Sequence, residues 1–158
     1  MARTTDQLRR ELEGRERQLG ADHPDTLRAV NNLASLLQAK GKLTKAESLC
    51  RRALEGYEQQ LGADHPVTLN SVSNFAMLLK AQGKLAEAEP LCRRALEGRE
   101  QQLGAQHPAT LASVNNLSRL LVLRGKLTEM AVLFWRLRRF RVGVSGVTCH
   151  GLRTTGHV

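Results

Sequence analysis

Aromatic residues, cysteines and long apolar runs are all scarce in this chain of 158 residues. Only 3% of the residues are aromatic, which argues against an aromatic-rich all-β fold and against a platform that stacks nucleic-acid bases. No apolar run approaches the roughly 20 residues that span a bilayer. Three cysteines are too few and too far apart for a disulfide framework or a zinc site. The N-terminus, which mixes acidic and basic residues, is typical of neither a signal nor a transit peptide. These absences predict a cytoplasmic protein without a metal or cofactor.

The positive charge is concentrated at the C-terminus. The formal net charge is +9, but residues 131–158 contain five Arg and no acidic residue, whereas residues 1–130 hold 19 Lys and Arg against 15 Asp and Glu. The main body is therefore only mildly basic. With 41% hydrophobic residues, it can bury a core and form one domain.

The chain repeats itself with a period of 42 residues. Residues 20–61 align without a gap on residues 62–103, with 30 of 42 positions identical, and a third copy starts at Gly104 and follows the pattern to about Glu129. Residues 9–20 match the end of a copy. Each copy holds two segments with apolar residues at helical spacing, separated by short turns that contain Gly or His-Pro. The predicted helices span 5–19, 24–39, 43–60, 66–81, 85–102, 108–123 and 127–140.

Neither helix of a copy can bury its apolar stripe alone, so neighbouring copies must stack. Gly14, Gly56 and Gly98 fall inside the second helices, where a glycine indicates either a close helix approach or a slight bend. Acidic residues of the second helices alternate with Arg at helical spacing, which predicts a solvated, ion-paired face. The acidic residues concerned are Glu47, Glu55, Glu58, Glu87, Glu89 and Glu97.

The repeat carries a fixed set of packing residues, with a small Ala where the two helices cross: Val30, Leu33, Ala34, Leu37, Gly41, Leu43, Ala46, Cys50, Ala53 and Leu54. With its 42-residue period, this pattern resembles the tetratricopeptide repeat. The longer variant of that repeat occurs in kinesin light chains, in nephrocystin-type proteins and in the sensor arrays of some nucleotide-binding signalling proteins. The resemblance covers about residues 9–129 and does not separate these groups.

The resemblance implies an all-α fold, a right-handed α-solenoid of stacked antiparallel helix pairs. Residues 1–141 would form the array, with a partial leading helix at 1–19 and repeats at 20–61, 62–103 and 104–141, followed by an irregular basic tail at 142–158. In such arrays the first helices line a concave groove that holds peptides or partner helices. The resemblance implies no catalysis, and the chain contains no phosphate-binding loop, Gly-x-Ser-x-Gly or His-Glu-x-x-His motif.

Asn32, Asn74 and Asn116 recur at one position of all three first helices. An amide side chain there suits binding of peptide backbone, and in related repeat proteins this position faces the groove. The alternative is an Asn that connects adjacent helices. Helix geometry adds neighbours on the same face, so that the predicted peptide-binding residues are Arg28, Asn31, Asn32, Ser35, Asn70, Ser73, Asn74, Met77, Lys80, Asn115, Asn116 and Arg119. Basic residues among them predict a preference for acidic peptides.

Two other recurring residue types have structural interpretations. His23, His65 and His107 lie roughly 10 Å apart in stacked helix pairs, too far for one metal, and are interpreted as helix-start residues. Cys50 and Cys92 occupy an interior position and are interpreted as core residues. The adjacent Cys149 and His150 lack a third orienting group, so they do not indicate a nucleophilic site.

Similarity to the repeat stops abruptly after Glu129. Met130–Val158 keeps a helical stripe to about Phe140 but adds exposed aromatic residues beside the Arg cluster of Arg136–Arg141. This segment is a basic-aromatic contact element, an adventitious end from a change of reading frame or exon, or a divergent cap. We favour the adventitious end. The predicted function is a non-enzymatic scaffold for protein partners, resembling the cargo or adaptor module of kinesin light chains; the alternative is binding of nucleic acid or anionic membrane through the Arg-rich end. The oligomeric state is open.

Overall fold

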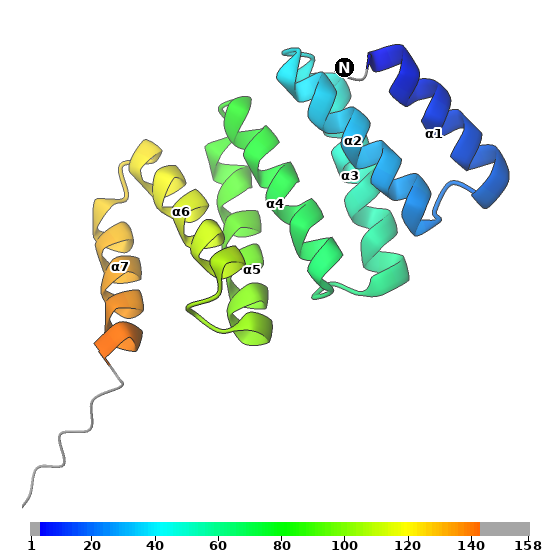
Figure 1. The fold of residues 1–158 in the computed structure, drawn as a ribbon. Helices are drawn as coiled ribbons and strands as arrows, with labels where there is room; N and C mark the ends of the chain where they lie inside the picture. Colours follow the sequence, from blue (N-terminus) through cyan, green and yellow to red (C-terminus); the bar gives the residue numbers. More distant parts are fainter. Residues whose placement is uncertain (1–3, 143–158) are drawn as a thin grey trace, which may run out of the picture.

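The computed structural model describes the backbone of residues 4–142 and the side chains of residues 4–135. This part of the chain forms helices joined by short turns, and the helices stack side by side in successive pairs (Figure 1). Each helix packs chiefly on its two neighbours along the chain. The predicted all-α solenoid is confirmed, and every predicted helix is found within two residues of its expected ends. The helices are α1 (Thr5–Leu19), α2 (Pro24–Ala39), α3 (Leu43–Leu61), α4 (Pro66–Ala81), α5 (Leu85–Leu103), α6 (Pro108–Leu123) and α7 (Leu127–Val142).

The first helices, α2, α4 and α6, all begin at the His-Pro turn. The proline is the first helical residue, where its missing N–H has no helical partner in any case. The histidine caps the helix: Nδ1 of His23, His65 and His107 accepts a hydrogen bond from the backbone N–H two residues later, at 3.2, 3.2 and 3.1 Å. The interpretation of these residues as helix-start residues is confirmed.

Replacing the central cap should measurably destabilise the array. His65→Ala removes the acceptor for the N–H of Val67 and is expected to lower the free energy of unfolding by roughly 0.5–2 kcal/mol. His65→Asn supplies another capping side chain and should recover most of the loss. Chemical denaturation followed by circular dichroism measures both, and equal losses in the two variants would contradict the capping role.

The turn inside each pair is fixed by a glycine. Gly41 has φ +71°, a conformation that residues with a Cβ rarely adopt. The N–H of Lys42 donates to the carbonyl of Leu37 at 2.9 Å and that of Gly41 donates to the carbonyl of Gln38 at 2.9 Å. This pair of bonds is a Schellman motif, which satisfies the last carbonyls of α2. It recurs at Gly83 and Gly125, so all three pairs turn in the same way.

Two glycines of the second helices mark close helix crossings. A Cβ added at Gly56 would lie 2.7 Å from the side chain of Leu27, and one at Gly98 would lie 2.8 Å from that of Leu69. Both leucines are 0% exposed. Gly14 has no such neighbour within 4 Å. Of the two sequence interpretations, close approach therefore holds for Gly56 and Gly98.

The third crossing departs from this pattern. Leu111, in the register of Leu27 and Leu69, is 43% exposed. The side of the α6–α7 pair that holds Leu111 is therefore more open to solvent than the equivalent sides of the α2–α3 and α4–α5 pairs.

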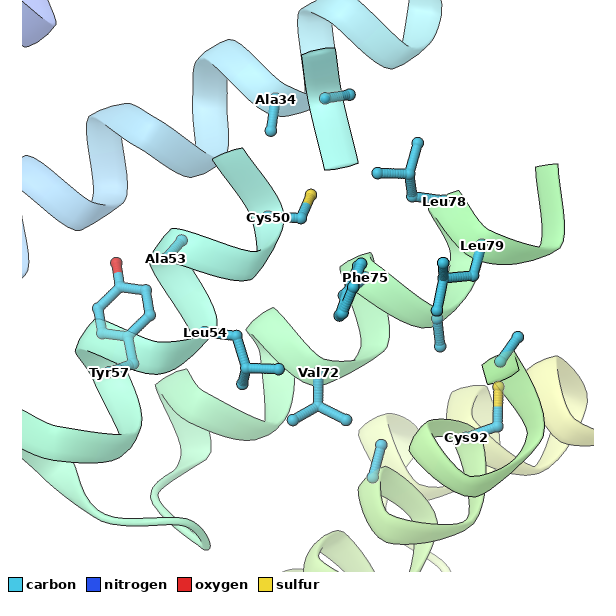
Figure 2. Packing of buried hydrophobic residues seen from close by; sticks show 14 of the residues in the cluster. Ala34, Cys50, Ala53, Leu54, Tyr57, Val72, Phe75, Leu78, Leu79 and Cys92 are labelled. Carbon is cyan, nitrogen blue, oxygen red and sulfur yellow. The ribbon is translucent and has the colours of Figure 1, made fainter. Parts of the chain in front are cut away.

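A single core runs along the stack (Figure 2). The view shows side chains of α2, α3, α4 and α5 gathered between the helices, with Cys50 of α3 and Cys92 of α5 among the apolar residues. Both thiols are free and 4% exposed, and burial raises the pKa of Cys50 to about 11. The interpretation of these cysteines as packing residues is confirmed, because a protonated, enclosed thiol is unreactive.

Candidate functional site

The three first helices expose matching faces. Each buries one side in the core and leaves the opposite side accessible to solvent. We call this surface the first-helix face; it comprises the twelve residues predicted to bind peptide. All of them are exposed or half-buried: Arg28, Asn31, Asn32, Ser35, Asn70, Ser73, Asn74, Met77, Lys80, Asn115, Asn116 and Arg119.

The recurring asparagines on this face have no partners within the described residues. Asn32 and Asn74 are exposed and Asn116 is half-buried, and none forms a side-chain hydrogen bond with residues 4–135. The connecting role falls to a different asparagine: Nδ2 of Asn31 donates to Oγ of Ser71 on α4 at 3.5 Å. The amides of Asn32, Asn74 and Asn116 are therefore available to a ligand.

The charges of the first-helix face are mostly positive. Arg28 is paired with Asp25 at 2.8 Å, which neutralises it. Lys80 and Arg119 have no carboxylate partner among residues 4–135. The unneutralised positive charge thus lies over α4 and α6.

A buried cation that was not predicted from the sequence lies beneath this face. Arg99 extends from α5 to the gap between α4 and α6 and is only 8% exposed. Its Nη1 donates to Oγ of Ser113 at 2.6 Å, and its Nη2 donates to Oδ1 of Asn70 at 2.6 Å and to the carbonyl of Leu69 at 3.5 Å. Burial lowers its pKa. The available signal was the alignment of the copies, in which Arg99 replaces Tyr57.

The opposite edge of the stack carries an ion-pair cluster at the turns between paired helices. Glu89 accepts hydrogen bonds from Arg93 at 2.8 Å, from Lys126 at 3.1 Å and from Arg124. Although burial alone would raise its pKa, these three donors lower it to about 2. One copy earlier, Glu47 binds Lys84 and Gln82.

This cluster corrects the expectation of a solvated acidic face. The Glu89 side chain is only 7% exposed and Glu47 is 16% exposed. Besides an Arg of its own helix, each binds residues of the next copy, so these carboxylates connect neighbouring pairs. Glu55, Glu87 and Glu97 are exposed as expected. Half-buried Glu58 pairs with Arg94 at 2.5 Å.

A shallow pocket of about 450 Å³ lies at the same edge, beside Glu47. It is lined by Gly41, Leu43, Thr44, Glu47, Gln82 and Lys84. None of these belongs to the first-helix face, so the pocket and the predicted peptide-binding residues are separate.

Neither a metal site nor a membrane span is found in the described part of the chain. No group of three or more His, Cys, Asp or Glu among these residues is arranged to hold a metal ion. None of these helices is both long and apolar enough to cross a bilayer. Of the predicted tail at 142–158, only Val142 is described, and it is the last residue of α7. Cys149, His150 and the rest of that tail lie outside the described residues, as do the side chains of the Arg136–Arg141 cluster.

Comparisons with known proteins agree with this architecture. A family model described as tetratricopeptide repeat matches residues 26–79 and again residues 68–129. Comparison with curated proteins finds no match.

Solved structures show the same stacking. Two crystal structures of a kinesin light chain candidate from Podosopora anserina, with nearly identical TPR-like repeats, are similar to the chain. They are 25% and 26% identical to this chain in sequence, with TM-scores of 0.73 and 0.72. Each match covers 87% of this chain and 65% of the kinesin light chain protein. BtubC (BKLC) from P. vanneervenii matches with a TM-score of 0.78 at 18% identity, over 98% of this chain and 61% of its own. The last likeness shows the fold alone. The chain spans less than two thirds of each of these proteins.

Proposed function

Because the chain belongs to the tetratricopeptide repeat family, we propose that it is a non-enzymatic interaction module that binds peptide or helical segments of partner proteins on its first-helix face. The observation that carries this proposal is the recurrence of Asn32, Asn74 and Asn116 on three neighbouring helices, without hydrogen-bond partners among residues 4–135. Each amide offers two donors and an acceptor to a peptide backbone.

The charge of the face supports acidic partners. Lys80 and Arg119 are unpaired among the described residues, and each would contribute only about 0.2–1 kcal/mol to an exposed ion pair. Several contacts must therefore combine to give specificity. Similarity to proteins described as kinesin light chains supports a cargo or adaptor role. Free, buried thiols at Cys50 and Cys92 fit a cytoplasmic site of action.

The triple change Asn32→Ala, Asn74→Ala and Asn116→Ala tests the binding surface. It should weaken binding of a captured partner by roughly tenfold or more, because each lost hydrogen bond contributes about 0.5–1.5 kcal/mol. Helix content should be unchanged, since alanine favours helices. Titration of the partner measures affinity, and circular dichroism measures helix content.

A matched control lies on the second helices. Gln59→Ala and Gln101→Ala change exposed amides of α3 and α5 and should leave affinity unchanged. If the Asn variant keeps full affinity, or if the Gln variant loses as much, the first-helix face is not the binding surface.

A further inference from the structure

The guanidinium of Arg99 is held out of water, and no carboxylate among residues 4–135 neutralises it. Its hydrogen-bond partners among the described residues, Ser113, Asn70 and Leu69, are all neutral. A buried cation whose hydrogen-bond acceptors are all neutral is less stabilised than one that contacts an anion. The lowered pKa that burial gives Arg99 is consistent with this poor stabilisation.

The equivalent positions of the two earlier copies differ from Arg99 in how their side chains are neutralised. Arg15, two copies earlier, pairs with Glu11 at 2.7 Å. Tyr57, one copy earlier, carries no charge; its hydroxyl donates to the carbonyl of Pro24 at 3.4 Å. Of these three positions, Arg99 alone has a buried charge and no carboxylate partner within residues 4–135, so an acidic side chain of a ligand would neutralise it.

The partner on the solvent side of Arg99 can move aside. Asn70 is exposed on α4 and supplies the 2.6 Å contact through its side chain, not its backbone. Rotation of that side chain removes the amide oxygen from Nη2 without any change in the helix. A carboxylate arriving on the first-helix face would then replace a neutral acceptor with a charged one, which forms a stronger hydrogen bond.

We propose that Arg99, which is held in place by Ser113 and covered by the movable side chain of Asn70, forms a subsite that selects one acidic side chain, Asp or Glu, of a peptide bound on the first-helix face. The proposal rests on the peptide-binding function proposed above. The subsite lies between α4 and α6. The corresponding position between α2 and α4 has Tyr57 instead, so the acidic residue of the ligand is placed over the second and third copies and the bound peptide has a defined register.

Peptide libraries test the proposal on the full chain. Two libraries of labelled nonapeptides, random except for Glu or Gln fixed at the centre, are compared by fluorescence anisotropy. The Glu library should bind the chain more tightly, and Arg99→Tyr should lower its affinity by about tenfold to a hundredfold, as expected for loss of a hydrogen bond to a charged group. Binding of the Gln library should change little. Tyrosine is already accommodated at this register, where Tyr57 is 3% exposed, and thermal unfolding verifies that the variant is folded.

A second variant distinguishes two roles of Asn70: covering Arg99, or contacting the peptide directly. Asn70→Ala removes the neutral acceptor that competes with the ligand, so it should increase the ratio of Glu to Gln affinity. If Asn70 only contacts the peptide, both libraries should weaken equally, and the subsite is wrong. The subsite is also wrong if the chain binds both libraries without preferring Glu, or if that preference survives Arg99→Tyr. Failure to bind either library would instead overturn the peptide-binding function itself, and the subsite with it.

Discussion

Leu69→Ala is expected to lower the free energy of unfolding by about 3–5 kcal/mol, because it opens a cavity at the centre of the array. Leu69 is 0% exposed and lies directly beneath Gly98. Urea denaturation followed by circular dichroism measures the loss. A loss below about 1 kcal/mol would show that the crossing of α4 and α5 is loosely packed.

A substitution at Gly98, which faces Leu69 across the contact between α4 and α5, serves as the control for Leu69→Ala. Gly98→Ala places a Cβ 2.8 Å from Leu69 and should itself destabilise the chain by about 1 kcal/mol or more, because overpacking outweighs the gain in helix propensity. In the double variant the new methyl group enters the space left by Leu69→Ala, so the two losses should not add. Gly14→Ala, with no neighbour within 4 Å, should instead stabilise the chain by up to roughly 1 kcal/mol.

Glu89→Gln is expected to lower the free energy of unfolding by roughly 2–3 kcal/mol at neutral pH. The variant keeps the side-chain shape but removes the carboxylate of Arg124 and leaves Arg93 and Lys126 with Glu129 alone. Glu97→Gln, on the exposed side of the same helix, should have little effect. Denaturation of the three proteins in parallel makes the comparison, and equal stability of the Glu89 and Glu97 variants would contradict a structural role for this cluster.

The contribution of Glu89 to the free energy of unfolding should depend on pH. The pKa of Glu89 is lowered from 4.5 to about 2 in the folded chain, so its contribution is complete above the unfolded value and disappears as pH falls from 4.5 towards 2. The difference in stability between wild type and Glu89→Gln should therefore shrink over this range. A difference that stays constant down to pH 2 would show that the charge of Glu89 does not stabilise the fold.

Local signals made the helices predictable. The His-Pro turn and the glycine at each helix end act through the residues next to them, so the boundaries could be placed from the sequence to within two residues. Repetition then supplied the stacking, because each amphipathic helix needs a neighbour. The packing role of Cys50 and Cys92 followed from their interior position in the helical pattern.

Contacts between copies were not predictable in the same way. Glu89 looked like a solvated residue of an amphipathic helix, but its burial depends on Arg124 and Lys126, about one full repeat further along the chain. Arg99 is likewise buried by Asn70 and Ser113, on two different helices. Helical periodicity describes one helix at a time, and it cannot tell which charged side chain lies between two others.

The exposure of Leu111 in the α6–α7 pair makes the stability of the helix pairs unequal. Leu27 and Leu69 are fully buried, whereas Leu111 is 43% exposed, so less apolar packing protects the third pair at this position than protects the first two. In a chain stabilised by nearest-neighbour contacts, the least protected unit opens first. Local opening of the α6–α7 pair is therefore expected before opening of the two preceding pairs. Leu69, one of the two fully buried leucines, belongs to α4, so tight packing supports the helix that carries Asn70 and Asn74.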